Sequence, residues 1–125
     1  MSISGIGTDL CDIRRIAELL EKFGDRFKTK VFTEGERATC DVRADPASCY
    51  AKRFAAKEAV AKAIAGEATG ALPWHSVEVA NDGSGRPRAV LHGAAAERVS
   101  GEARVHLSLS DDPPYALAFV VVEAP

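Results

Sequence analysis

Four charged residues interrupt an apolar, alanine-rich segment at residues 53–65, RFAAKEAVAKAIA. On a helix, which turns by ~100° per residue, Lys57 falls within the apolar face and Arg53 falls close to it. Glu58 and Lys62 lie together on the adjoining flank, one turn apart. Such a surface suits a polyphosphate and its divalent metal, because a carboxylate is a hard ligand for Mg²⁺ and cations neutralise phosphate oxygens.

A purely structural interpretation of the same residues stays open. Glu58 and Lys62 would form an exposed i, i+4 ion pair worth ~0.2–0.5 kcal/mol. Lys57 and Arg53 would extend their charged ends out of the core to reach water. This interpretation is the more common one for an arbitrary helix, so the segment alone does not decide between solvated charge and chemistry.

A second carboxylate stands near the N-terminus, in the sequence GIGTDLCDI. Asp9 follows the Gly-x-Gly pair of Gly5 and Gly7 at the predicted end of a strand. It is either a turn or helix-capping aspartate or a second oxygen ligand for the metal, since Mg²⁺ is commonly held by one or two carboxylates plus substrate phosphates. The glycines complete neither a dinucleotide fingerprint nor a P-loop.

The elements that must position these residues are predicted from hydrophobic periodicity and from capping signals. Asp12 caps the first helix, and the pair Thr33 and Glu36 forms a capping box for the next. Helices are predicted at residues 13–23, from about 34, from 46 to Gly66 and within 93–101, and strands at 2–7, 77–80, 88–92, 104–110 and 115–123. This order indicates an α+β fold in which an antiparallel sheet packs on a long central helix.

Length and composition predict one domain spanning residues 1–125, large enough to bury a core without disulfides or a structural metal. The net charge of −2 gives no sign of general nucleic-acid or membrane binding. The three cysteines lack metal-binding spacing, and their odd number excludes a full disulfide framework. A reducing, cytoplasmic location is the simplest interpretation, and no signal peptide or membrane-spanning run is recognised.

Three segments together resemble holo-[acyl-carrier-protein] synthase, the short, single-domain class of 4′-phosphopantetheinyl transferases. They are GIGTDLCDIRRI at residues 5–16, FTEGE at 32–36 and RFAAKEAVAKAI at 53–64. The later NDGSGRPRAVLHG, VHLSLS and YALAFVVVE also look like the C-terminal half of that family. The resemblance covers nearly the whole chain in the right order, and the pairing of F-x-x-K-E-x-x-x-K with an upstream G-I-G-x-D is specific.

The resemblance implies a fold, a reaction and a set of site residues. Enzymes of this family transfer the 4′-phosphopantetheine arm of coenzyme A to a serine of acyl carrier protein and release adenosine 3′,5′-bisphosphate. By resemblance, Asp9 and Glu58 hold Mg²⁺ against the pyrophosphate, and Lys62 stabilises charge on the bond that breaks. Glu58 or a metal-bound water would take the proton of the serine. Phosphoryl transfer depends mainly on positioning and neutralised charge, which these residue types supply.

The resemblance also implies the coenzyme A contacts and the partners. Arg53, Lys57, Lys62 and Gly66 are expected at the coenzyme A site, with Arg53 near the 3′-phosphate and Lys57 either structural or phosphate-supporting. Arg14 and Arg15 match the basic first helix with which the family meets the acidic acyl carrier protein, although they could simply form the polar side of an amphipathic helix. The family usually forms homotrimers with active sites at clefts between subunits.

One position departs from the family pattern. The family commonly has a histidine after its S-L-S segment, near the 3′-phosphate, whereas this chain has Asp111 followed by Asp112. An acidic pair beside a phosphate would repel it. The departure motivates a second hypothesis, in which the chain is a carrier-protein or coenzyme A binding module of the same fold with reduced or no transferase activity.

Overall fold

The computed structural model describes residues 1–65 and 72–125. In chain order its elements are β1 (Ser2–Asp12), α1 (Ile13–Phe23), α2 (Asp25–Val31), α3 (Glu34–Asp41), α4 (Pro46–Ala65), the 3-10 helix η1 (Trp74–Ser76), β2 (Val77–Asn81), β3 (Pro87–Leu91), α5 (Gly93–Glu97), β4 (Arg104–Asp112) and β5 (Tyr115–Ala124). The described strands form two antiparallel sheets, β1-β5-β4 and β2-β3. The predicted α+β class is confirmed, but there are two sheets where one was expected.

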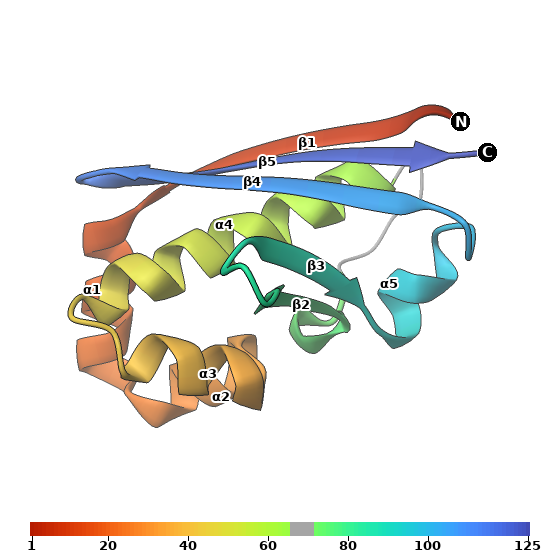
Figure 1. The fold of residues 1–125 in the computed structure, drawn as a ribbon. Helices are drawn as coiled ribbons and strands as arrows, with labels where there is room; N and C mark the ends of the chain where they lie inside the picture. The colour runs from red at the N-terminus through yellow and green to blue at the C-terminus, as the bar shows by residue number, and fades with distance from the viewer. Residues whose placement is uncertain (66–71) are drawn as a thin grey trace.

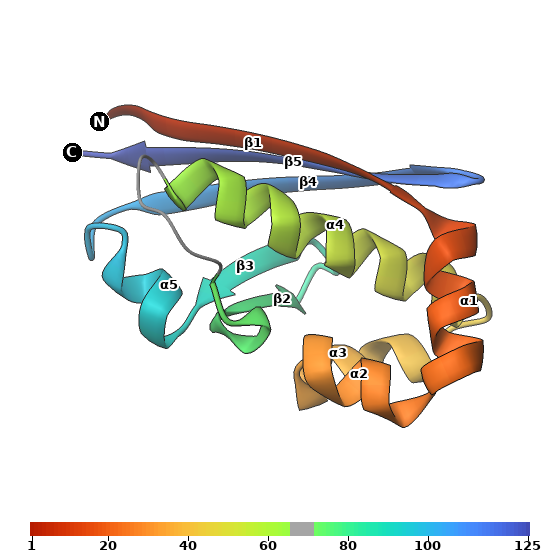
Figure 2. The same ribbon diagram turned by 180° about the vertical axis from the view of Figure 1, so that it is seen from behind.

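Helix α4 forms the middle of the molecule (Figure 1). The long strands β1, β5 and β4 cover one side of it, and the short helices and the β2–β3 hairpin lie on the other side, as the view from behind also shows (Figure 2). Twelve of its twenty residues are buried, so the helix is enclosed on more than one side. This enclosure explains why its sequence has no continuous polar face.

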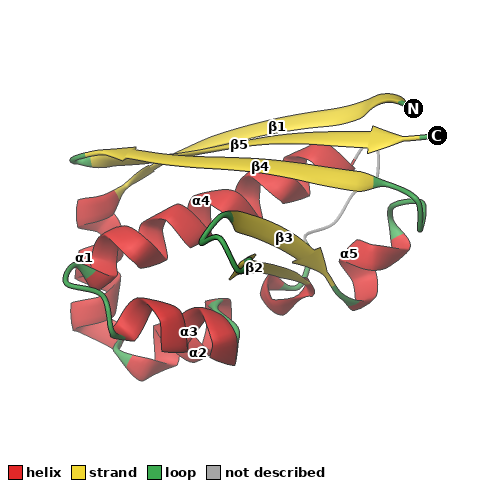
Figure 3. Ribbon diagram, in the orientation of Figure 1, coloured by secondary structure: helices red, strands yellow, loops and turns green. Residues whose placement is uncertain are grey.

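Local signals set most of the helix boundaries (Figure 3). The carboxylate of Asp12 accepts a hydrogen bond from the backbone N–H of Arg14 and begins α1, which ends at Gly24. The capping box of Thr33 and Glu36 begins α3, as predicted. Helix α2 was not predicted, because its seven residues follow a glycine that makes no side-chain cap.

Strand β1 is longer than predicted, since it continues through Asp9 to Asp12 and pairs with β5 along this whole length. Asp9 is therefore a strand residue and not part of a turn. Strand β5 lies between β1 and β4, as its nearly continuous apolar sequence predicts. Within the described ranges, no helix is both long enough and apolar enough to cross a membrane.

Small residues let β1 lie directly on α4. A Cβ atom added to Gly7 would lie 2.0 Å from the carbonyl oxygen of Ala59, and one added to Gly5 would lie 2.0 Å from that of Ala63. Both contacts are with helix backbone, which cannot rotate away as a side chain can. The strand thus needs glycine here because two backbones approach closely.

We expect the substitution Gly7→Ala to destabilise the fold by about 3 kcal/mol, the upper end of the usual penalty for overpacking a core. The added methyl would overlap the backbone of Ala59, so β1 and α4 would have to separate. Urea denaturation followed by circular dichroism measures the change. Gly83→Ala is the matched control, because nothing lies within 4 Å of its added Cβ. Equal stability of the two variants would contradict the close approach.

Candidate active site

The contact between β1 and α4 brings Asp9 to the helix that carries the other predicted site residues. The Lys62 ammonium donates to Asp9 Oδ1 at 3.2 Å and to the Thr8 carbonyl at 3.0 Å. Gly7, two residues before Asp9, lies against Ala59, the neighbour of Glu58. The strand therefore gathers Asp9, Lys62 and the turn of α4 that contains Glu58.

Glu58 does not form the i, i+4 pair with Lys62 that the structural interpretation required. That interpretation is wrong for these two residues, since Lys62 turns to Asp9 instead. Among the residues that the structure describes, Glu58 has no ion-pair partner. It is half-buried and lines a cavity of about 240 Å³ with Trp74. A carboxylate placed in this way is available to an external cation.

Lys57 is buried, with only 2% of its side chain exposed, so it does not extend to water as the structural interpretation also required. Its ammonium donates to the carbonyl oxygens of Trp74 and Val77 and pairs with Glu36 at 2.8 Å. These three partners use all three of its N–H donors. Burial lowers the pKa of Lys57, and the Glu36 carboxylate opposes this effect. Of the two roles predicted for Lys57, structural and phosphate-supporting, these contacts favour the structural one.

Glu36 is the residue that sequence reasoning missed. It was recognised only as part of a capping box, yet it is fully buried and ties three elements together. One carboxylate oxygen accepts from the Thr33 backbone and contacts Lys57, and the other accepts from the Val79 backbone at 2.8 Å. The available signal was a lysine on the apolar face of a helix, which demands a buried counter-charge from elsewhere in the chain.

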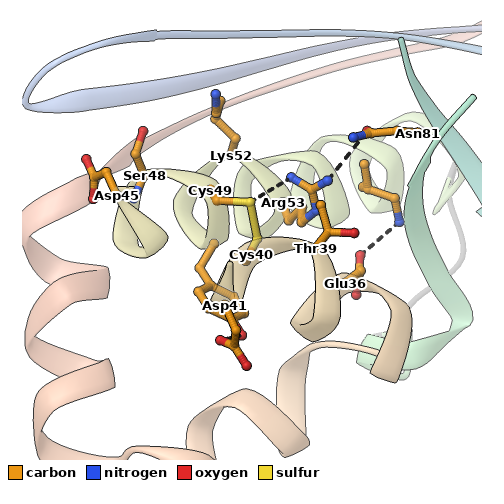
Figure 4. Close-up of a disulfide and its surroundings, with 12 residues drawn as sticks. Glu36, Thr39, Cys40, Asp41, Asp45, Ser48, Cys49, Lys52, Arg53 and Asn81 are labelled. Atoms are coloured by element: carbon orange, nitrogen blue, oxygen red, sulfur yellow. Dashed lines mark hydrogen bonds between the residues drawn. A yellow bond between two sulfur atoms is a disulfide. The ribbon is translucent and has the colours of Figure 1, made fainter. Parts of the chain in front are cut away.

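Arg53 is also buried, with 4% exposed, but its contacts differ from those of Lys57. It lines a cavity of about 440 Å³ together with Arg43, Lys52 and Asn81. Its Nη1 donates to Cys49 Sγ at 3.2 Å, and its Nη2 reaches Asn81 Oδ1 at 3.5 Å (Figure 4). Its Nε has no partner among the described atoms, and burial lowers its pKa. This guanidinium is suited to an anionic ligand.

Asp111 lies on β4 and lines the same cavity as Arg53. Its carboxylate accepts a hydrogen bond from Ser48 Oγ at 3.1 Å and lies 3.4 Å from the Lys52 ammonium. The negative charge that replaces the histidine of the family is therefore partly balanced from α4. Repulsion of a phosphate is weaker than the sequence alone indicates.

The two arginines of α1 are both exposed. Arg14 forms two side-chain hydrogen bonds with Asp12, of 2.9 and 2.7 Å, and these hold the pKa of that carboxyl below its usual value. The Arg15 guanidinium lies 5.8 Å from the centre of the Phe54 ring. Asp12 thus orients Arg14 as well as capping the helix, and α1 presents both arginines at the surface.

The cysteines are not all reduced. Cys40 and Cys49 form a disulfide between α3 and α4, with their Cα atoms 5.4 Å apart, and Cys11 is a buried free thiol (Figure 4). The sequence excluded a full disulfide framework and favoured a reducing setting, and it did not predict this single bond. Spacing alone could not reveal it, because Cys40 and Cys49 lie in different helices and meet only where α3 packs on α4.

Gly66, predicted at the coenzyme A site, lies outside the described residues. Within the described ranges there is no group of three or more metal-ligating side chains. The predicted metal site therefore has only the carboxylates Asp9 and Glu58, which is the number that Mg²⁺ commonly takes from a protein when phosphates and water complete its shell. Oxygen donors of this kind fit Mg²⁺ and do not fit a soft metal.

Residues 5–120 match the family model of the 4′-phosphopantetheinyl transferase superfamily. The chain belongs to this superfamily. A holo-[acyl-carrier-protein] synthase of Methylobacterium radiotolerans is 55% identical over 128 residues, which cover 98% of this chain and 94% of that protein. One from Paramagnetospirillum magneticum is 53% identical over 130 residues, covering 98% of this chain and 97% of that protein.

Solved structures agree with this assignment. The acyl carrier protein synthase of Mycobacterium tuberculosis has a TM-score of 0.79 at 36% identity, covering 99% of this chain and 100% of that one. A complex of the Chronobacterium ammoniagenes enzyme with coenzyme A has a TM-score of 0.84 at 29% identity, covering 100% and 99%. The predicted family, fold class and enzyme class, a 4′-phosphopantetheinyl transferase, are confirmed.

We expect Lys57→Met to lower the free energy of unfolding by about 3–5 kcal/mol, because the Glu36 carboxylate would stay buried without its counter-charge. Adding Glu36→Gln to this variant should restore part of the loss, and a double-mutant cycle by urea denaturation measures the coupling. Lys30→Met on an exposed site is the control. A stable Lys57→Met protein that fails only in phosphate binding would support the other predicted role.

Proposed function

We propose that this chain is a holo-[acyl-carrier-protein] synthase, which transfers the 4′-phosphopantetheine arm of coenzyme A to a serine of apo-acyl carrier protein and releases adenosine 3′,5′-bisphosphate. The observation that carries the proposal is the cluster of Asp9, Glu58 and Lys62 at the contact of β1 and α4. Two carboxylates and a cation in one place are the groups that phosphoryl transfer from a pyrophosphate requires.

Asp9 and Glu58 are the residues that would hold Mg²⁺. The ion, when bound, neutralises charge on the pyrophosphate and makes the nucleotide a better leaving group. Lys62 already contacts Asp9, so its ammonium lies where it can neutralise a phosphate oxygen beside the metal ligands. Glu58 is also our candidate for the general base that takes the proton of the serine hydroxyl. It is half-buried, and it has no ion-pair partner among the described residues.

The cavity around Arg53 would receive the nucleotide end of coenzyme A. Arg53, Arg43 and Lys52 give it a positive wall, and the contacts of the Arg53 guanidinium, with a sulfur and an amide oxygen, leave its charge uncompensated. Asp111 weakens this wall but is itself held by Lys52 and Ser48. We therefore assign the cavity to the 3′-phosphate and its ribose, as the sequence resemblance implied for Arg53.

The acidic acyl carrier protein would dock on α1 through Arg14 and Arg15, both of which are exposed. Charge complementarity of this kind mainly speeds the encounter and selects the partner. The chain would act as a single domain in the cytoplasm, where apo-carrier proteins are available.

Self-association is supported by an apolar patch on the outer face of the three-stranded sheet. Ile6 and Leu10 of β1 and Leu117 and Phe119 of β5 are all exposed and lie on the face opposite α4. Contiguous exposed apolar surface of this kind marks an interface. The site residues also face separate cavities of one chain, with Arg53 in one and Glu58 in another. In a homotrimer with active sites between its subunits, the Arg53 cavity of one copy and the Glu58 cavity of another copy would form one complete site.

We expect the wild-type protein to be trimeric and Phe119→Lys to be monomeric, because a buried lysine at the interface would lose its hydration without gaining a partner. Light scattering coupled to gel filtration measures the mass. Phe23→Lys is the matched control, since Phe23 is exposed to a similar extent, 41% against 47%, but lies on α1. A monomeric wild-type protein would remove the trimer from the proposal.

The transfer itself is tested by mass spectrometry. Incubation with apo-acyl carrier protein, coenzyme A and Mg²⁺ should add the mass of phosphopantetheine to the carrier, and a chelator should abolish the reaction. Glu58→Gln keeps the shape of the side chain but removes its charge, so we expect the rate to fall by roughly 10²- to 10³-fold, the usual loss for one electrostatic contact to the reacting group. Glu97→Gln, at an exposed position of α5, should transfer normally.

The runner-up function is a binding module of the same fold, favoured by the acidic Asp111 in the nucleotide cavity. The same assay separates the two. Coenzyme A binding without any mass shift on the carrier would favour the binding module. Full activity of Glu58→Gln would remove that residue from the mechanism but leave the transferase function standing.

A further inference from the structure

The disulfide forms part of the wall of the cavity that contains Arg53. Cys49 lines this cavity, whereas Cys40 lies behind it and is fully buried. Cys49 Sγ accepts a hydrogen bond from Arg53 Nη1 at 3.2 Å (Figure 4). A reductant that enters the cavity would therefore meet the sulfur of Cys49 first.

The bond also closes a short loop that supplies more of the same wall. Residues 40 and 49 are nine positions apart, and Arg43, Ala44 and Asp45 between them line the cavity. A crosslink across so short a loop limits the conformations of everything within it. The disulfide thus restrains Arg43 as well as the neutral Cys49 sulfur beside Arg53. Arg43 and Arg53 are both cationic and both line the cavity.

A second link joins the same two helices next to the disulfide. The Tyr50 hydroxyl donates to Asp41 Oδ1 at 2.6 Å, and the Lys28 ammonium contacts the same oxygen at 3.0 Å. These bonds hold the pKa of Asp41 below its usual value. They do not depend on redox state, so α3 and α4 stay attached when the disulfide opens. Reduction would therefore loosen the loop, which the Asp41–Tyr50 hydrogen bond still closes, without unfolding the protein.

We propose that the Cys40–Cys49 pair is a reversible thiol–disulfide switch that sets the affinity of the Arg53 cavity for its anionic ligand, with high affinity in the disulfide form. The identity of that ligand, the 3′-phosphate nucleotide of coenzyme A, rests on the proposed function. In the disulfide form Cys49 Sγ is neutral, and Arg53 has no carboxylate partner among the described residues. In the reduced form Arg53 stabilises a Cys49 thiolate, which competes with the phosphate for the same guanidinium.

The redox step needs a dithiol as reductant. One thiolate of the dithiol attacks Cys49 Sγ, the S–S bond breaks, and Cys40 leaves as a thiolate that takes up a proton. The second thiolate then attacks the mixed disulfide and releases Cys49, which is protonated in turn or held as a thiolate by Arg53. Two electrons pass to the protein, and the dithiol becomes a cyclic disulfide. In a reducing compartment such pairs are typically transient and redox-sensing rather than permanent crosslinks.

The first test counts thiols in the folded protein. Dithiothreitol is applied without denaturant, the protein is then alkylated in denaturant, and its mass is measured. We expect one alkylated cysteine before reduction, Cys11, and three after it, with circular dichroism unchanged and the single count restored by oxidised dithiothreitol. A pair that is reduced only together with unfolding would overturn the proposal and identify a structural crosslink.

The second test measures binding of adenosine 3′,5′-bisphosphate, chosen because it carries no thiol that could reduce the protein. Calorimetry on the disulfide and reduced forms should show weaker binding after reduction, by roughly three- to tenfold, the ordering cost of one or two side chains. Cys40→Ala is the control, because it retains Cys49 beside Arg53 but cannot form the disulfide. Its affinity for the nucleotide should equal that of the reduced protein and should not change when the reductant is added.

Cys49→Ala separates the two causes, since it lacks both the bond and the thiolate. Its affinity should lie between those of the two wild-type forms. Equal binding by the disulfide and reduced proteins would overturn the switch. If neither form binds the nucleotide, the proposed function and the coupling both fail, while the thiol count still decides whether the pair is redox-active in the folded protein.

Discussion

The rest of the structure depends on the close approach of β1 to α4. Gly5 and Gly7 place the strand backbone against the helix backbone at Ala63 and Ala59, with no room for a side chain between them. The short distance between the two backbones decides the position of Asp9, because Asp9 lies only two residues after Gly7 on β1. The ion pair of Asp9 with Lys62 follows from it, and so does the proximity of Asp9 to the turn that carries Glu58. A local packing constraint thereby assembles the residues assigned to the metal and the pyrophosphate.

Helix α4 carries two buried cations, Lys57 and Arg53, and their different partners give them different roles. Lys57 has three partners within the chain, one of them the carboxylate of Glu36, so its charge is fully used in holding α3, α4 and β2 together. Arg53, one turn earlier, has only a sulfur and an amide oxygen within reach and keeps one donor unpartnered among the described atoms. An unpaired buried charge is costly unless a ligand completes it. This difference in partners indicates that Lys57 is a structural cation, whereas Arg53 is suited to bind an anionic ligand.

Much of the fold could be predicted because its signals are local. The capping residues Asp12 and Thr33 mark their helices, and the apolar run of β5 indicates a central strand. Helix α2 was missed because it has no side-chain cap and is held by contacts from elsewhere, such as that of His75 with the Thr29 carbonyl. The separation of the strands into two sheets was missed for a similar reason, since periodicity shows that a strand exists and not what it pairs with.

By itself the sequence determined the family, the starts of the capped helices α1 and α3, and the identity of the charged residues on α4. Motif order and capping follow directly from residue type and spacing. Only the tertiary structure decided which of those charges are free. It gave Lys57 its partner Glu36, turned Lys62 from Glu58 to Asp9, tied Asp111 to Lys52, and joined Cys40 to Cys49. Each of these pairs links separate elements, and Coulomb and covalent contacts between distant residues depend on distances that only packing sets.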